Sequence, residues 1–122
     1  MINPTYEYDC VVVQIVDGDT LDVSADLGFS ISLAERARVY GLNCREIHST
    51  DIEEKRLGLA DKAFAEGLLP SGTHAKMRSH KIDDPREKFG RWLCEIELPN
   101  GKDFAAEMIA AGHGIAYFGG RR

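Results

Sequence analysis

The N-terminal third of the chain alternates between apolar and polar positions, which is typical of β-strands. An apolar run interrupted only by Gln14 predicts a buried strand, and the Asp17-Gly18-Asp19 segment after it predicts a tight turn, because Asp-Gly readily adopts positive φ. Further short apolar or alternating segments follow closely. We expect strands at residues 10–16, 20–25, 29–33 and 36–42.

The apolar period lengthens after residue 52. A helix over residues 53–69 is predicted from steps of three and four between apolar side chains, and Pro70 would end it. Asp103 is a candidate N-cap for a second helix that Gly112 would end. The apolar face of the first helix would carry Leu57, Ala60, Phe64 and Leu68. Of the remaining segments, 73–78 and 92–98 are expected to be strands, 81–90 a charged loop and 104–111 the second helix.

This order of elements predicts an α+β protein that is mainly β. About five short strands close naturally into a small barrel, so we expect a five-stranded OB-fold barrel with two to three packed helices and antiparallel pairing throughout. The length of 122 residues fits a single domain, 1–122. The tail from Tyr117 onward is expected to be irregular.

Charge is distributed unevenly along the chain. The net charge of −5 at pH 7 argues mildly against nucleic acid as a partner. Residues 1–34 contain six acids and no Lys or Arg, whereas residues 74–91 contain six bases against three acids. An acidic end beside a basic segment suits a protein that holds a cation and a phosphate together, and it equally suits an ordinary solvated surface.

Composition also bears on location and redox state. No segment approaches the ~18 apolar residues of a membrane span, and the N-terminus lacks the pattern of a signal peptide, so the cytoplasm is expected. Three cysteines, an odd number without CxxC spacing, indicate reduced thiols rather than a disulfide framework or a zinc site: Cys10, Cys44 and Cys94.

Five side chains together supply what phosphodiester hydrolysis requires. The oxygens of Asp19 and Asn43 suit a hard divalent cation. The guanidinium groups of Arg38 and Arg91 can meet the extra negative charge of the transition state. The carboxylate of Glu46 can hold and deprotonate the attacking water.

The order and spacing of six segments resemble the staphylococcal nuclease-like (thermonuclease) family, in particular its short phage and bacterial members. The segments are VDGDTLDV (16–23), ADLGF (25–29), RARVYGLNCRE (36–46), GLADKAF (58–64), KFGRWL (88–93) and GHGIAYFGG (112–120). The resemblance implies an OB-fold enzyme that cleaves DNA and RNA with Ca²⁺. It implies catalytic roles for Arg38, Glu46 and Arg91, metal ligation by Asp19, Asn43 and the Cys44 backbone carbonyl, and nucleotide contacts by Lys88 and Tyr117.

Two positions depart from the family pattern. Asn43 stands where the family has a second metal-binding aspartate, and Arg45 replaces a proline before the glutamate, which would place a cation beside Glu46. Both changes should weaken cation binding without abolishing it, because an Asn oxygen is an accepted calcium ligand.

Two alternatives stay open at the level of sequence. The barrel is either an active nuclease, acting preferentially on single-stranded DNA or RNA, or a weak or inactive OB-fold module that binds nucleic acid or protein, since a fold does not by itself give a function. Asp17 is interpreted as a turn residue rather than a ligand. The four histidines are interpreted as surface or local hydrogen-bonding groups, and we expect a monomer with no membrane association.

Overall fold

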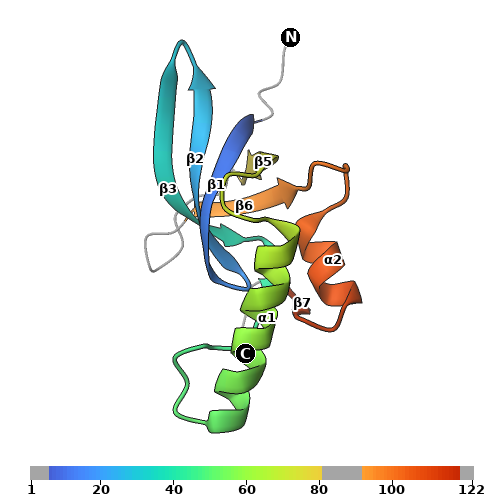
Figure 1. Ribbon diagram of the computed structural model, residues 1–122. Coiled ribbons are helices and arrows are strands. Elements are labelled where there is room, and N and C mark those ends of the chain that lie inside the picture. Colours follow the sequence, from blue (N-terminus) through green and yellow to red (C-terminus); the bar gives the residue numbers. More distant parts are fainter. Residues whose placement is uncertain (1–5, 81–91, 119–122) are drawn as a thin grey trace.

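The computed structural model describes residues 6–80 and 92–118, which form seven strands and two helices (Figure 1). In chain order these are β1 (Glu7–Asp17), β2 (Thr20–Gly28), β3 (Ile31–Val39), β4 (Gly41–Asn43), α1 (Ile52–Leu68), β5 (His74–Ser79), β6 (Trp92–Glu97), α2 (Phe104–Ala110) and β7 (Ile115–Tyr117).

Five of the strands close into a barrel in the order β1-β2-β3-β6-β5. The α+β, mainly β, OB-type barrel predicted from the sequence is therefore confirmed. The expectation of purely antiparallel pairing is wrong, because β3 and β6 pair in parallel, with Arg38 opposite Leu93. An odd number of strands cannot alternate in direction all the way round a closed ring, so at least one parallel pair is required.

The barrel interior is filled by the alternating apolar side chains that the sequence pattern identified. Leu21, Val23 and Ala25 of β2 are at most 5% exposed. Burying a Val or Leu side chain in this way contributes about 1.5–3 kcal/mol. Cys10 and Cys94 lie in the same core as free thiols, and burial raises their pKa to about 11 and about 12, so both are protonated at neutral pH.

The β2–β3 hairpin differs from its expected form. The two predicted segments 29–33 and 36–42 are joined in β3 as far as Val39, and the end of the second lies in β4. Cross-strand pairing with β2 runs from Ile31 to Arg38, with one register shift between Asp26 and Gly28. Phe29 and Ser30 lie in the connecting turn, both with positive φ. The hairpin extends away from α1, beyond the body of the barrel (Figure 1).

Both helices begin at aspartate caps. The predicted cap Asp103 is confirmed, since its carboxylate accepts a hydrogen bond from the Ala106 backbone N–H. Helix α1 begins at Ile52, capped by Asp51, whose Oδ1 accepts from the N–H groups of Glu53 and Glu54. Such caps satisfy N–H groups that have no partner within the helix. Among the described residues, neither helix has the length and apolarity needed to cross a membrane.

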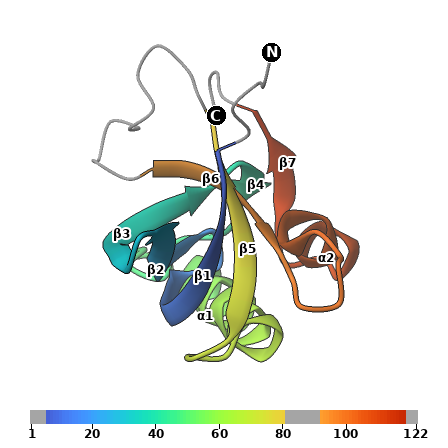
Figure 2. The same ribbon diagram turned by 90° about the horizontal axis from the view of Figure 1, so that it is seen from above.

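Strands β4 and β7 form a separate two-stranded ribbon, with Gly41 opposite Tyr117. Figure 2 shows β7 and α2 together on one outer side of the barrel. Tyr117 therefore ends a strand, in contrast to the irregular tail expected from that residue. Gly41 has a φ of +81°, and a Cβ there would approach the Phe118 ring to 3.1 Å, so a larger residue would disturb the ribbon.

Candidate functional site

One end of the barrel gathers most of the described residues for which the sequence predicted chemistry. The turn between β1 and β2 carries Asp17 and Asp19, and it meets the exit of β3, where the Val39 N–H donates to the Asp19 carbonyl at 2.9 Å. Register pairing places Thr20 opposite Arg38. The chain then passes through β4 into the loop that carries Cys44 and Glu46.

The carboxylate of Asp19 joins the β1–β2 turn to the loop after β4. The residue is only 8% exposed. Its Oδ1 accepts from the Thr20 hydroxyl at 3.0 Å and its Oδ2 from the Cys44 backbone N–H at 2.8 Å. Asp19 is thus held in one orientation, with its Oδ2 toward Cys44 and Arg38.

The guanidinium of Arg38 lies between the two side chains predicted to bind a cation. Its Nη2 donates to Asn43 Oδ1 at 3.4 Å and lies 3.7 Å from Asp19 Oδ2. Its Nη1 donates to the backbone carbonyls of Val39 at 3.0 Å and Leu42 at 2.5 Å. The structure therefore brings Arg38, Asp19 and Asn43 into direct contact, and the arginine supplies the positive charge between the two oxygens.

Asp17 has a feature that turn propensity did not predict. Its Oδ1 is buried and has no hydrogen-bond partner among the described residues. Burial raises the pKa of this carboxyl, and the negative charges of Asp19 and Glu46 raise it further, while His48 and Lys62 oppose the shift. A buried carboxylate oxygen without a partner is costly, so such an atom indicates a position suited to a cation.

Glu46 is the accessible member of the site. Its side chain is exposed and makes no hydrogen bond within the described part of the chain. Its backbone is held tightly, because a Cβ at Gly58 of α1 would come within 2.8 Å of the Glu46 carbonyl oxygen and 2.9 Å of that of Arg45. Helix α1 therefore supports the loop directly, and only a glycine permits this approach.

The expected position of the Arg45 charge is wrong. The Arg45 guanidinium does not lie free beside Glu46 but binds Asp61 of α1, with Nη2 2.5 Å from Asp61 Oδ1. Asp61 was missed in the sequence because the predicted apolar face of the helix is displaced from the buried one. The buried residues of α1 are Gly58, Asp61 and Ala65. The predicted face is only partly buried: Leu57, Ala60, Phe64 and Leu68. His113, interpreted as a local hydrogen-bonding group, approaches Asp61 Oδ1 with Nδ1 at 3.0 Å and stacks on Phe64.

The nucleotide-contact residues are only partly described. Tyr117 lies at the end of β7 and pairs with Gly41. Gly41 is two residues beyond Val39, the last residue of β3. Tyr40 directly precedes β4, and its ring lies against that of His80, with ring centroids 3.9 Å apart and a tilt of 32° between the planes. Arg91 and Lys88 lie outside the described residues.

The oxygen atoms at this end of the barrel bear on whether a calcium ion could bind there. Within residues 6–80 and 92–118, no three His, Cys, Asp or Glu side chains are arranged to hold a metal ion by themselves. Calcium also accepts amide oxygens, backbone carbonyls and water. The Asp19 carboxylate, the Asn43 amide and the Cys44 carbonyl are donors of the kinds that calcium accepts, and Asp17 adds a carboxyl group one residue before the turn.

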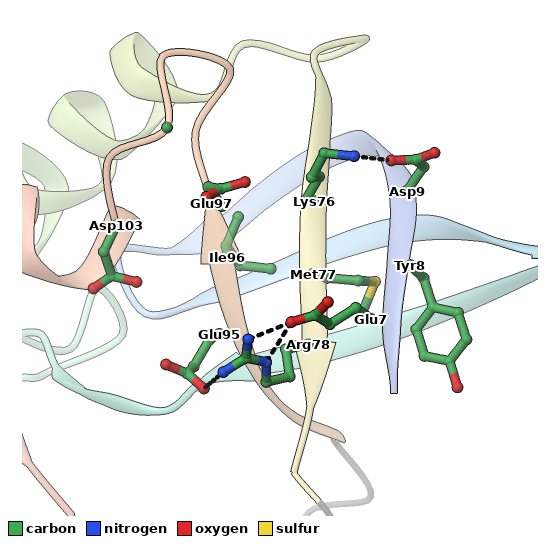
Figure 3. Close-up of a pocket in the computed structure, with 11 residues that line it drawn as sticks. Glu7, Tyr8, Asp9, Lys76, Met77, Arg78, Glu95, Ile96, Glu97 and Asp103 are labelled. Atoms are coloured by element: carbon green, nitrogen blue, oxygen red, sulfur yellow. Dashed lines mark hydrogen bonds and ion pairs between the residues drawn. The ribbon is translucent and has the colours of Figure 1, made fainter. Parts of the chain in front are cut away.

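A hollow on the outer face of β1, β5 and β6 has the wrong charge for a phosphate (Figure 3). Lys76 is paired with Asp9 at 2.8 Å, and Arg78 lies between Glu7 and Glu95. Exposed pairs of this kind contribute little to stability. With Glu97 and Asp103 added, carboxylates outnumber the bases, so this face repels nucleic acid.

The chain matches no protein-family model, and no curated protein sequence matches it either. The structure defines the fold as a closed five-stranded barrel with two helices. Any function has to be inferred from the side chains of the site, because a barrel of this kind serves unrelated functions.

Proposed function

We propose that this protein is a nuclease that hydrolyses phosphodiester bonds of DNA or RNA, preferentially single-stranded, with Ca²⁺. The observation that carries the proposal is that Asp19 Oδ2 and Asn43 Oδ1 face the same nitrogen of Arg38, at 3.7 and 3.4 Å. Oxygen ligands for a cation and a guanidinium for a phosphate therefore adjoin each other. The resemblance to the staphylococcal nuclease-like family supports the same assignment.

Asp19, Asn43 and the Cys44 carbonyl would hold the cation. When bound, calcium supplies positive charge that polarises a phosphate oxygen. Arg38 would bind a second phosphate oxygen, because its planar fork matches phosphate geometry. Its present partners are mainly neutral carbonyl and amide oxygens, which an anionic phosphate can displace.

Glu46 would act as the general base. Its exposed carboxylate can accept a proton from a water molecule as the water oxygen bonds to phosphorus and the ester P–O bond breaks. Arg91 is the proposed second arginine that meets charge on the phosphate, and Lys88 and Tyr117 are the proposed nucleotide contacts.

A second candidate function is an OB-fold module that binds nucleic acid or protein without hydrolysis. The observation in its favour is that three donor contacts of Arg38 are made to its own chain, at Val39, Leu42 and Asn43. An arginine held in this way stabilises the loop whether or not a phosphate ever binds.

Digestion of single-stranded DNA and RNA, with Ca²⁺ and with chelator, separates the two functions. The nuclease is expected to act only with Ca²⁺, and an identically purified Arg38→Ala variant controls for contaminating nucleases. Equal digestion with and without chelator would refute the metal role. Binding of oligonucleotide without turnover in Ca²⁺ would favour the non-catalytic module.

A further inference from the structure

We propose that Asp61 is a positioning residue that holds the site loop, defined as residues 43–46, in its working conformation through Arg45. This inference rests on the proposed function, because the loop carries Asn43, Cys44 and Glu46. Asp61 itself contacts no substrate or cation in the proposal. It acts from helix α1, 16 residues beyond Arg45 in the sequence.

Both carboxylate oxygens of Asp61 accept hydrogen bonds. Its Oδ2 accepts from the Arg45 backbone N–H at 3.1 Å and from Arg45 Nε at 2.9 Å. Its Oδ1 accepts from Arg45 Nη2 at 2.5 Å and approaches His113 Nδ1 at 3.0 Å. One carboxylate therefore fixes both the backbone and the side chain of Arg45, and it also contacts the turn that leads into β7.

The Asp61 carboxylate is buried and ionised. Asp61 is 0% exposed, and a charge in such a position is tolerated only when it is paired and hydrogen-bonded. Burial raises the pKa of Asp61, but hydrogen bonds from Arg45 and His113 outweigh that effect and lower it below its ordinary value. The carboxylate is consequently ionised at neutral pH, and the loop is held by a charge-assisted pair.

The pair acts on the residues of the site through the backbone. Arg45 is directly between Cys44, whose N–H donates to Asp19, and Glu46, whose carbonyl lies against Gly58. The site loop is thus held to the β1–β2 turn on one side and to α1 on the other. Since Arg45 has no ring to fix its φ, the hydrogen bonds from its backbone N–H and its side chain to Asp61 help to restrict the backbone at this point.

Loosening the pair should therefore move Glu46 and the Cys44 carbonyl without removing either. Displacement of reacting groups by about 1 Å can cost on the order of 10²-fold in rate. We expect Asp61→Asn to lower kcat by about tenfold or more, by the same positioning argument, while KM changes much less. Exchange of the Cys44 and Arg45 backbone amides with solvent deuterium should accelerate.

The matched control is Asp22→Asn, which weakens the exposed pair between Asp22 and Arg36. That pair has the same two-pronged geometry, with Arg36 Nε 2.8 Å and Nη2 3.3 Å from the two Asp22 oxygens. It lies outside the site loop, so kcat and amide exchange in residues 43–46 should stay at wild-type values. Equal losses in both variants would overturn the proposal.

A double variant separates positioning from simple stability. Replacing a buried ion pair by apolar side chains is often neutral or stabilising. Asp61→Leu combined with Arg45→Met should therefore recover the thermal stability lost in Asp61→Asn and still show low kcat and fast exchange in the site loop. A stable double variant with wild-type kcat would overturn the positioning role.

The two proposals fail in different ways. A wild-type protein that hydrolyses nothing in Ca²⁺ would refute the nuclease assignment, and the amide-exchange comparison would still decide whether Asp61 holds the loop. Hydrolysis by wild type with unchanged kcat and unchanged exchange in folded Asp61→Asn would refute the inference alone.

Discussion

Arg38 and Asp19 form a buried ion pair, with Arg38 Nη2 3.7 Å from Asp19 Oδ2 and side-chain exposures of 12% and 11%. The distance is too long for a direct hydrogen bond, so attraction between the charges is the main interaction. Hydrogen bonds to other groups hold each side chain in place. In the proposed function, Arg38 would bind a phosphate and Asp19 a cation.

Arg38→Lys should cost far more activity than the retained charge would suggest. Lysine keeps the positive charge but loses the planar fork that matches a phosphate. We expect kcat to fall by about 10²-fold or more, as when one transition-state donor is removed. Arg36→Lys is the matched control, since Arg36 is an exposed residue of the same strand that pairs with Asp22. Near-parental turnover in a folded Arg38→Lys variant would show that the arginine is structural.

Glu46→Gln should keep the fold and oligonucleotide binding but lose most turnover. Glutamine preserves the shape of the side chain and removes the proton acceptor. The exposed position of Glu46 predicts little change in thermal stability. Single-turnover kinetics and binding titrations measure the two effects separately, with Glu66→Gln on exposed α1 surface as control. Equal losses in binding and turnover would mean that Glu46 anchors the loop.

Asn43→Asp should tighten calcium binding. The substitution replaces a neutral ligand oxygen by an anionic one, and ligand charge largely sets calcium affinity. We expect calcium affinity to increase by about tenfold, which corresponds to roughly 1.4 kcal/mol of binding free energy. A unit charge beside a dication can readily supply that much. Calorimetric titration measures it, and Asn100→Asp in the turn before α2 is a control with the same change in net charge. If the variant binds calcium no tighter, Asn43 is not a ligand.

Asp17→Asn should stabilise the protein at pH 7 and weaken calcium binding. The pKa of Asp17 is raised, so between the unfolded-state pKa and the folded-state pKa the folded protein binds more protons, and the free energy of unfolding falls as pH rises. The cost of ionising Asp17 in the folded protein therefore lowers the free energy of unfolding at pH 7. Removing the charge should therefore raise the free energy of unfolding at pH 7, because burial and the nearby carboxylates disfavour the ionised form.

Urea unfolding at pH 7 and at pH 4 tests this prediction. The difference in stability between Asp17→Asn and wild type should shrink as pH falls and the wild-type carboxyl becomes protonated. Asp26→Asn, in the exposed β2–β3 hairpin, makes the same chemical change and should shift stability little. A less stable Asp17→Asn variant at pH 7 would show that the carboxylate has a partner that stabilises it.

Local patterns in the sequence were sufficient for most of the fold. The alternation of Leu21, Val23 and Ala25 predicted the core face of β2, and Asp103 predicted the start of α2. Both features depend on neighbours within a few residues, such as the Ala106 N–H that Asp103 caps.

The sequence by itself determined most of the strands, both helices and the residue types available to the site. Only the tertiary structure decided which of them meet: β3 beside β6 in parallel, Arg45 on Asp61 16 residues away, and His113 on the same carboxylate 52 residues away. Strand and helix periodicity record which face of an element is buried, but not which distant side chain lies opposite. Those long-range contacts are set when five strands close into a ring and α1 packs against it. A carboxylate buried by that packing is tolerated only where it is paired and hydrogen-bonded.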